Sequence, residues 1–246
     1  MTHILITGAA SGIGRAAALK LAAEGTRLTL IDRDASGLDT LLSEHSGGDW
    51  QAVPMDVSDP DAWAALDLGD APLTGGVIAA GISDAAPITE LSFSDWRRVL
   101  SINLDGAFLA LQAVLRHAGE GASIVAVSSA TGKKAVPNTA AYGASKAALS
   151  QIVKVAALEA APRQIRVNAI APGGVKTPMF SNLGFFKELT ALHGDEDAAW
   201  SAMAVETPLK RFSEPEEMAA LIAFLLGPDA ASITGAVLDC DGGYSV

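Results

Sequence analysis

Short apolar runs alternate with longer amphipathic segments along the whole chain. The apolar runs predict buried strands at 4–6, 27–31, 53–57, 75–81, 122–127, 164–171 and 233–239. Helical spacing of apolar residues predicts helices at 15–24, 35–44, 58–66, 94–100, 104–117, from Asn138 or Thr139 to Pro162, and at 214–226. Strands that alternate with helices favour parallel pairing and right-handed crossovers. We therefore expect one α/β domain, a doubly wound parallel sheet with helices on both faces.

A glycine-rich turn joins the first strand to the first helix. It reads Thr7-Gly8-Ala9-Ala10-Ser11-Gly12-Ile13-Gly14. Between a strand and a helix, such a turn points backbone N–H groups at a phosphate. Gly8 permits the sharp turn, Gly12 lets a pyrophosphate approach the backbone, and Gly14 lets the helix pack close to the strand. The spacing differs from G-x-G-x-x-G, and a glycine turn alone can also be a plain loop.

An acidic residue closes the second predicted strand. Asp32 stands about 20 positions beyond the glycines, where a carboxylate can accept both hydroxyls of an adenosine ribose. A phosphate on that ribose would be repelled, which favours NAD over NADP. Arg33 is the opposing signal, because an arginine here can bind the 2′-phosphate. We favour Asp32 because it ends the strand and Ser11 supplies no second positive charge; its alternative role is to cap the next helix.

Tyr142 and Lys146 stand four residues apart in Ala141-Tyr142-Gly143-Ala144-Ser145-Lys146. On a helix both side chains lie on one face. A nearby positive charge favours the phenolate, whose pKa is normally near 10, so the pair is a candidate general acid/base for an alcohol oxygen. The alternative is a surface helix with a solvated lysine. Ser129 follows a strand and can converge with the phenol over one pocket; it lacks the G-x-S-x-G elbow of an acyl-transfer nucleophile.

Several polar residues and strand ends leave alternatives open. Asp56, followed by Val57, caps a helix or holds an adenine amino group, and the small residues Ala80 and Gly81 leave space for a flat ring or ribose. Asn103 stands where two helical segments join. Its amide either forms hydrogen bonds with backbone groups that a break in the helix leaves unpaired, or it holds a water for a proton relay. The turn Pro172-Gly173-Gly174-Val175-Lys176-Thr177-Pro178 can meet a nicotinamide carboxamide.

The segment 179–207 is the longest irregular stretch and is rich in large apolar side chains. An apolar lid over an active site explains that concentration, and a small satellite core is the alternative. The candidate substrate contacts are Ser83, Val136, Met179, Phe180, Phe185 and Phe186, with Asp84, Lys133 and Lys134 as further residues at the pocket edge. We expect a fairly apolar substrate, cyclic or aromatic.

Composition and net charge limit the kinds of partner that the protein can bind. Half of the residues are hydrophobic and 18% are charged, which excludes extensive disorder. The net charge of −11 argues against nucleic acid and anionic membranes. A single cysteine, Cys240, indicates a reducing compartment, and the four histidines show no metal-ligand spacing, so we expect no metal. We expect no signal peptide and no apolar stretch of membrane-spanning length, hence a soluble cytoplasmic protein.

Together these motifs resemble the short-chain dehydrogenase/reductase family across essentially the whole chain. The shared positions are Thr7-Gly8-x-x-x-Gly12-x-Gly14, Asn103, Ser129, Tyr142-x-x-x-Lys146 and Pro172-Gly173. The resemblance implies a Rossmann-like domain of about seven parallel strands, usually a homotetramer. It also implies residue roles: Tyr142 as acid/base, Lys146 on the nicotinamide ribose, Ser129 on the substrate oxygen, Asn103 on a water, Asp56 and Val57 at the adenine, Val175 and Thr177 at the nicotinamide.

The chain departs from the family pattern after the fourth strand. Where the family often has Asn-Asn-Ala-Gly, this chain has Ile78-Ala79-Ala80-Gly81. The hydrogen bonds that these asparagines would make are absent, so we expect the end of this strand to be less rigid. The motifs predict hydride transfer between NAD and a secondary alcohol or ketone. Two alternatives stand beside that reading: a 3-oxoacyl thioester reductase, and a dinucleotide-binding sensor or scaffold without turnover.

Overall fold

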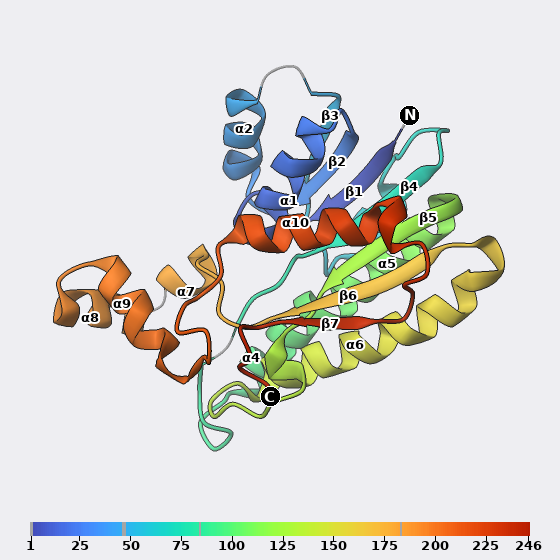
Figure 1. Cartoon of the computed structure of the whole chain (residues 1–246). Coiled ribbons are helices and arrows are strands. Elements are labelled where there is room, and N and C mark those ends of the chain that lie inside the picture. The colour runs from blue at the N-terminus through green and yellow to red at the C-terminus, as the bar shows by residue number, and fades with distance from the viewer. Residues whose placement is uncertain (1, 46–47, 84, 183) are drawn as a thin grey trace.

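Seven parallel strands form one sheet in the order β3-β2-β1-β4-β5-β6-β7 (Figure 1). The computed structural model describes residues 2–45, 48–83, 85–182 and 184–246. The number of strands and helices refers to these residues. The strands are β1 His3–Thr7, β2 Arg27–Asp32, β3 Trp50–Pro54, β4 Leu73–Ile78, β5 Ala118–Val127, β6 Arg166–Pro172 and β7 Val237–Cys240. The chain order reverses between β1 and β4, and such a reversal opens a crevice at the strands' carboxyl ends.

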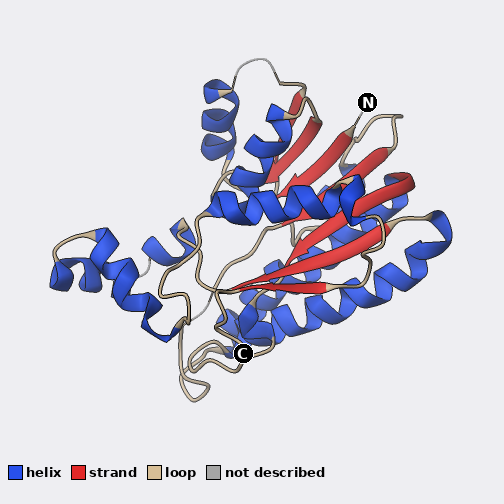
Figure 2. Cartoon of the chain, viewed as in Figure 1, coloured by secondary structure: helices blue, strands red, loops and turns tan. Residues whose placement is uncertain are grey.

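Helices cover both faces of the sheet (Figure 2). The main ones are α1 Gly12–Ala23, α2 Ala35–Glu44, α3 Pro60–Ala65, α4 Phe93–Leu100, α5 Gly106–His117, α6 Ala140–Ala160 and α10 Pro215–Leu226. One core cluster joins α1, α2 and α10 to the sheet, and a second joins α3, α5 and α6 to its other face. Central strands such as β1 are buried on both faces, which explains their continuous apolar runs. The expected doubly wound, single-domain Rossmann-like fold is confirmed.

The run Phe93–His117 is one continuous helix instead of two. A π-helical segment, η1 Ser101–Asp105, joins α4 to α5 at the position where the sequence predicted a break. The 25-residue run is also long and apolar enough to span a membrane, contrary to expectation. However, Ala110, Leu111 and Val114 are packed against the sheet in the second core cluster. The α5 part of this run therefore contributes to the core of the domain.

Several boundaries differ from the sequence prediction; for example, β4 ends at Ile78 instead of 81, and β5 starts at Ala118 instead of 122. β3 starts earlier than expected and ends at Pro54. The helix predicted from 58 starts at Pro60, because the Asp59 carboxylate accepts the N–H groups of Asp61 and Ala62. The last strand starts only at Val237, since Gly235 takes a left-handed turn with φ 72°.

Candidate active site

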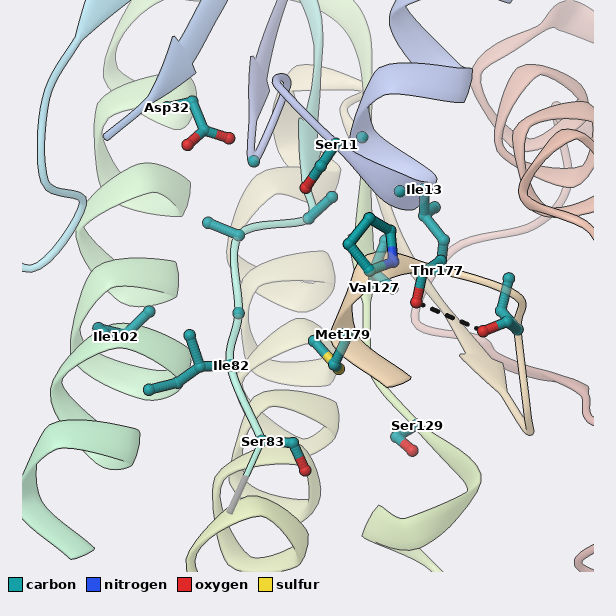
Figure 3. Close-up of a pocket in the computed structure, with 18 of the residues that line it drawn as sticks. Ser11, Ile13, Asp32, Ile82, Ser83, Ile102, Val127, Ser129, Thr177 and Met179 are labelled. Carbon is teal, nitrogen blue, oxygen red and sulfur yellow. Dashed lines mark hydrogen bonds between the residues drawn. The ribbon is translucent and has the colours of Figure 1, made fainter. Parts of the chain in front are cut away.

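A cavity of about 630 Å³ opens at the carboxyl ends of the strands beside the β1–β4 crevice. Figure 3 shows Asp32 at one end and Ser83 and Ser129 towards the other. The predicted site residues that line it are Gly8, Ser11, Gly12, Ile13, Gly14, Asp32, Arg33, Asp56, Val57, Ala80, Gly81, Ser83, Ser129, Tyr142, Lys146, Pro172, Gly173, Val175, Thr177, Met179 and Phe180. Residues from distant parts of the sequence are therefore gathered around one space.

The glycine turn has no room for side chains. Gly8 has φ +69°, and a Cβ there would lie 2.8 Å from the Ala80 nitrogen. A Cβ on Gly14 would overlap the Gly8 carbonyl oxygen. Ser11 gives α1 no side-chain cap, so the first N–H groups of the helix are available to an anion. These features fit the pyrophosphate of a dinucleotide.

The Asp32 carboxylate is held in place from two sides. It accepts the N–H groups of Ala10 and Asp34, both at 3.0 Å. Asp34, and not Asp32, caps α2 by accepting the N–H of Gly37 at 3.1 Å. The capping role considered for Asp32 is therefore wrong. A carboxylate has about four acceptor sites, so Asp32 retains capacity for ribose hydroxyls.

Asp56 forms a local turn on the cavity wall. Its carboxylate accepts the N–H of Ser58 at 2.9 Å and the Ser58 hydroxyl at 2.7 Å. These bonds lower the pKa of Asp56 and keep it ionised. Asp59 caps α3, so the capping role considered for Asp56 is wrong, and the contact between Asp56 and adenine stays a prediction.

Lys146 is buried beside Tyr142 on α6. Its side chain is 3% exposed, and burial lowers its pKa to about 8. The ammonium donates to the Val127 carbonyl oxygen at 2.8 Å and lies 5.7 Å from the centroid of the Tyr142 ring. The helix therefore holds a positive charge next to the phenol, as the four-residue spacing predicts.

The two consecutive serines after β5 have different surroundings. Ser129 lines the cavity, and its Oγ accepts the N–H of Thr131 at 3.2 Å, which uses an oxygen lone pair and not the hydroxyl hydrogen. Ser128 Oγ instead donates to the Lys146 carbonyl oxygen at 3.0 Å. Of the two, Ser129 has the geometry for a hydrogen bond to a ligand oxygen.

Asn103 lies next to the cavity but does not line it. Its fully buried amide pairs with the backbone of Ile82, whose N–H and C=O each lie at 2.8 Å. Its Nδ2 also donates to Ser145 Oγ at 3.2 Å, and Ser145 lies on α6. The side chain ties the loop after β4 to the π-helical segment and to α6, which agrees with the structural alternative. The bonded backbone belongs to another segment and not to the helix itself.

The end of β4 is held without the family asparagines. The Thr7 hydroxyl accepts the N–H groups of Ala79 at 3.1 Å and Ala80 at 3.3 Å. Asn103 holds Ile82 a little further along. The loss of rigidity expected from the sequence is therefore offset by Thr7.

The 179–207 segment divides between the cavity and a core of its own. The prediction that it is irregular is wrong, because its described residues include most of α7 Pro178–Ser181 and all of α8 Gly184–His193 and α9 Glu196–Met203. Met179 and Phe180 line the cavity, whereas Phe186 packs on Trp200 with ring centroids 4.2 Å apart. Phe180 also touches this cluster, which includes Phe212.

Three predicted contacts at the pocket edge and two on α8 need correction. Among the described residues, Val136, Lys133, Lys134, Phe185 and Phe186 do not line the cavity. Phe186 is buried in the aromatic cluster, and Phe185 is exposed. Lys133 pairs with Asp239, and Lys134 with the Tyr244 carbonyl and ring, so both are held at the C-terminal segment. Asp84 lies outside the described residues.

Sequence reasoning missed several wall residues. They are Asp34, Met55, Ala79, Ile82, Ile102, Val127, Ser128, Pro178 and Asn182. Most of them stand next to a predicted site residue. The rule that ligands bind at the carboxyl ends of parallel strands therefore finds them when it is applied to the complete loop after each strand. Ile102 stands next to Asn103, but it lies in the π-helical segment and not at a strand end, so the rule does not cover it.

Comparisons with known proteins give one family. A family model described as enoyl-(acyl carrier protein) reductase matches residues 8–245. The cis-4-hydroxycyclohexanecarboxylate dehydrogenase of Sinomonas cyclohexanicum is 39% identical over 251 residues, which cover 98% of this chain and 95% of that enzyme.

Solved structures agree with the family model. Actinorhodin polyketide ketoreductase with NADPH superposes with a TM-score of 0.89 at 31% identity, covering 99% of this chain and 97% of the other. A 3-oxoacyl-[acyl-carrier protein] reductase of Brucella melitensis with bound NAD gives 0.85 at 32% identity, covering 100% and 91%. The resemblance seen in the motifs is confirmed: the chain belongs to the short-chain dehydrogenase/reductase family of oxidoreductases, which use nicotinamide dinucleotide cofactors.

Proposed function

We propose that the protein transfers a hydride between NAD(H) and a secondary alcohol or ketone. The observation that carries this proposal is one cavity lined at one end by the glycine turn and Asp32, and at the other by Ser129, Tyr142 and Lys146. NAD-dependent oxidation of at least one member of a panel of secondary alcohols tests it. A dinucleotide-binding scaffold would bind NADH and turn nothing over.

Tyr142, Lys146 and Ser129 each have a separate role at the substrate oxygen. When bound, the nicotinamide accepts or gives the hydride. Tyr142, as phenolate, takes the proton from the alcohol hydroxyl, and the nearby Lys146 ammonium favours that phenolate. Ser129 donates a hydrogen bond to the oxygen as negative charge develops on it. Asn103 acts as a positioning residue, because it fixes Ile82 and α6 relative to one another.

The proposed substrate is fairly apolar, cyclic or aromatic. Ile82, Met179 and Phe180 provide an apolar wall near Ser83. The relative from Sinomonas is named for a hydroxylated cyclohexane, which supports a cyclic alcohol. The family description and the Brucella relative favour the second candidate, a 3-oxoacyl thioester reductase. A comparison of kcat/KM for cyclic alcohols and for a 3-oxoacyl thioester separates the two.

We propose NAD over NADP on the position of Asp32. A carboxylate at this end of the cavity repels a ribose 2′-phosphate. We expect NADH to bind more tightly than NADPH, and Asp32→Asn to reduce that preference by about tenfold, which corresponds to about 1.4 kcal/mol. Fluorescence titration of both cofactors measures the ratio.

The neighbouring aspartate provides a matched control. Asp34→Asn removes the same charge from the same wall, and asparagine caps a helix as well as aspartate does. We expect the cofactor preference of that variant to stay unchanged. Tighter NADPH binding by the wild type would contradict the assignment, and Arg33 would then be the residue that selects the cofactor.

The segment 179–207 is proposed to act as a substrate lid. The aromatic cluster of Phe186, Trp200 and Phe212 makes α8 and α9 one packed unit, and Phe180 joins that unit to the cavity wall. Such a unit can close over a substrate and exclude water.

We further propose a cytoplasmic homotetramer, with a homodimer as the alternative. Phe108 on α5 and Val155 and Leu158 on α6 are exposed apolar side chains, and Leu158 is 78% exposed. Their burial between copies of the chain would remove apolar surface from water. Cys240 is largely buried, and burial raises its pKa to about 12, which suits a protein that keeps its thiol reduced. The solution mass, measured by light scattering, tests the assembly.

A further inference from the structure

The end of β5 holds Lys146 at two separate atoms. The Val127 carbonyl oxygen accepts the Lys146 ammonium at 2.8 Å. The next residue, Ser128, donates its hydroxyl to the Lys146 backbone carbonyl at 3.0 Å. Ser128 is 2% exposed and Lys146 3%, so both bonds lie in a low-dielectric interior. The last residue of β5 and the residue after it thus hold the side-chain tip and the backbone carbonyl of the same lysine.

The backbone after these residues packs against the same point of α6. A Cβ added to Gly132 would lie 2.9 Å from the Ala147 nitrogen and 2.9 Å from the Lys146 carbonyl carbon. Only glycine permits this approach of the 3₁₀ turn η2, Ala130–Gly132, to the helix. The contact between the β5 end and α6 is therefore concentrated on Lys146.

A second hydroxyl reaches the same carbonyl from a different direction. Ser150 Oγ donates to the Lys146 carbonyl oxygen at 2.9 Å and lies 2.7 Å from Ser128 Oγ. The Ser150–Lys146 bond lies within α6, and Ser150 reaches the strand end only through Ser128 Oγ, so Ser150 alone does not locate the helix relative to the sheet. The Ser128 bond crosses from the strand end to the helix and can do so.

We propose that Ser128 is a positioning residue, whose hydroxyl sets α6 against the end of β5 so that Tyr142 and Lys146 meet Ser129. The inference rests on the proposed function. Ser129 follows Ser128 directly, so its hydroxyl and the helix share one anchor. Displacements of about 1 Å cost up to about 10² in rate when reacting groups must be aligned.

Three substitutions test this role. Ser128→Ala is expected to lower kcat/KM by about 10-fold to 100-fold. Ser150→Ala removes an equivalent hydroxyl from the same carbonyl and should leave kcat/KM within about twofold of the wild type. Ser128→Cys retains a weak donor of similar size and should recover part of the activity. It also serves if the alanine variant folds poorly.

A second readout requires neither substrate nor cofactor. The lowered pKa of Lys146 makes wild-type stability rise between about pH 8 and 10.5, because the unfolded chain holds the lysine proton over that range and the folded chain releases it. If Ser128 keeps Lys146 in place, Ser128→Ala reduces this rise in denaturant midpoint, whereas Ser150→Ala retains it.

The outcomes separate the inference from the proposed function. Equal losses in Ser128→Ala and Ser150→Ala, or no loss in either, overturn the positioning role. A wild type without NAD-dependent turnover overturns the proposed function, and the pH readout still decides whether Ser128 holds Lys146.

Discussion

Tyr142→Phe is expected to bind NADH as the wild type does and to lose turnover by about 10² to 10⁴. The substitution removes one oxygen and keeps the ring, which lies 5.7 Å from the Lys146 ammonium. The cavity wall therefore retains its shape, while the group that takes the proton from the alcohol is gone. Stopped-flow or steady-state oxidation of an accepted alcohol measures the rate, and fluorescence titration measures NADH affinity.

The second tyrosine of the chain is a matched control. Tyr244 lies at the C-terminal segment, where the Lys134 ammonium lies 3.9 Å from its ring centroid, and it does not line the described cavity. Tyr244→Phe removes the same oxygen and keeps that ring contact, so turnover should stay close to that of the wild type. Undiminished turnover in Tyr142→Phe would end the acid/base assignment.

The fold followed from the sequence because most strands contain an apolar run that stands between helices. Where the burial is complete, as in β1 and β2, the observed elements match the predicted ones to within one residue at each end. β3 is half-buried, and its start at Trp50 was not visible as an apolar run. Burial, and not length, decides which boundaries a pattern can predict.

The site was predictable where the chemistry depends on spacing along one element. Tyr142 and Lys146 share a helix face, and Ser129 follows the end of β5 by two residues, at the carboxyl edge of the parallel sheet. Phe186 shows the opposite case. Its apolar side chain is as well suited to a substrate wall as to a core, and only packing on Trp200 decides between them.

The positioning role of Ser128 could not be predicted from the sequence, for a related reason. Two adjacent serines after a strand are equivalent in the sequence, but successive side chains of extended backbone point in opposite directions. One therefore faces the cavity and the other faces α6. Asn103 likewise needed the structure, because its partner Ile82 is 21 positions away along the chain.

Lys146→Met is expected to remove turnover and yet leave the folded protein at least as stable at pH 7. Loss of the charge deprives the Tyr142 phenolate of its stabilising neighbour, so we expect a rate loss of about 10² or more. The fall of the lysine pKa from 10.5 to about 8 corresponds to a cost of about 3 kcal/mol for burying the ammonium, which methionine does not incur.

The loss of one hydrogen bond opposes that gain. Without the ammonium, the Val127 carbonyl loses a donor, which costs about 1–3 kcal/mol. The balance is near zero or favourable. We expect an unfolding midpoint no lower than that of the wild type and up to about 4 °C higher. Differential scanning calorimetry at pH 7 measures it.

The pH dependence of stability shows whether the buried Lys146 ammonium stabilises or destabilises the folded protein. Below about pH 8 the ammonium is charged in both states, and the folded chain carries the cost of its burial. Between about pH 8 and 10.5 the folded protein releases the proton before the unfolded chain does, so the wild type gains stability relative to Lys146→Met. Lys154→Met, an exposed lysine on the same helix, should change neither turnover nor this difference. A Lys146→Met midpoint many degrees below the wild type at pH 7 would show that the buried ammonium stabilises the fold instead of serving the reaction at its expense.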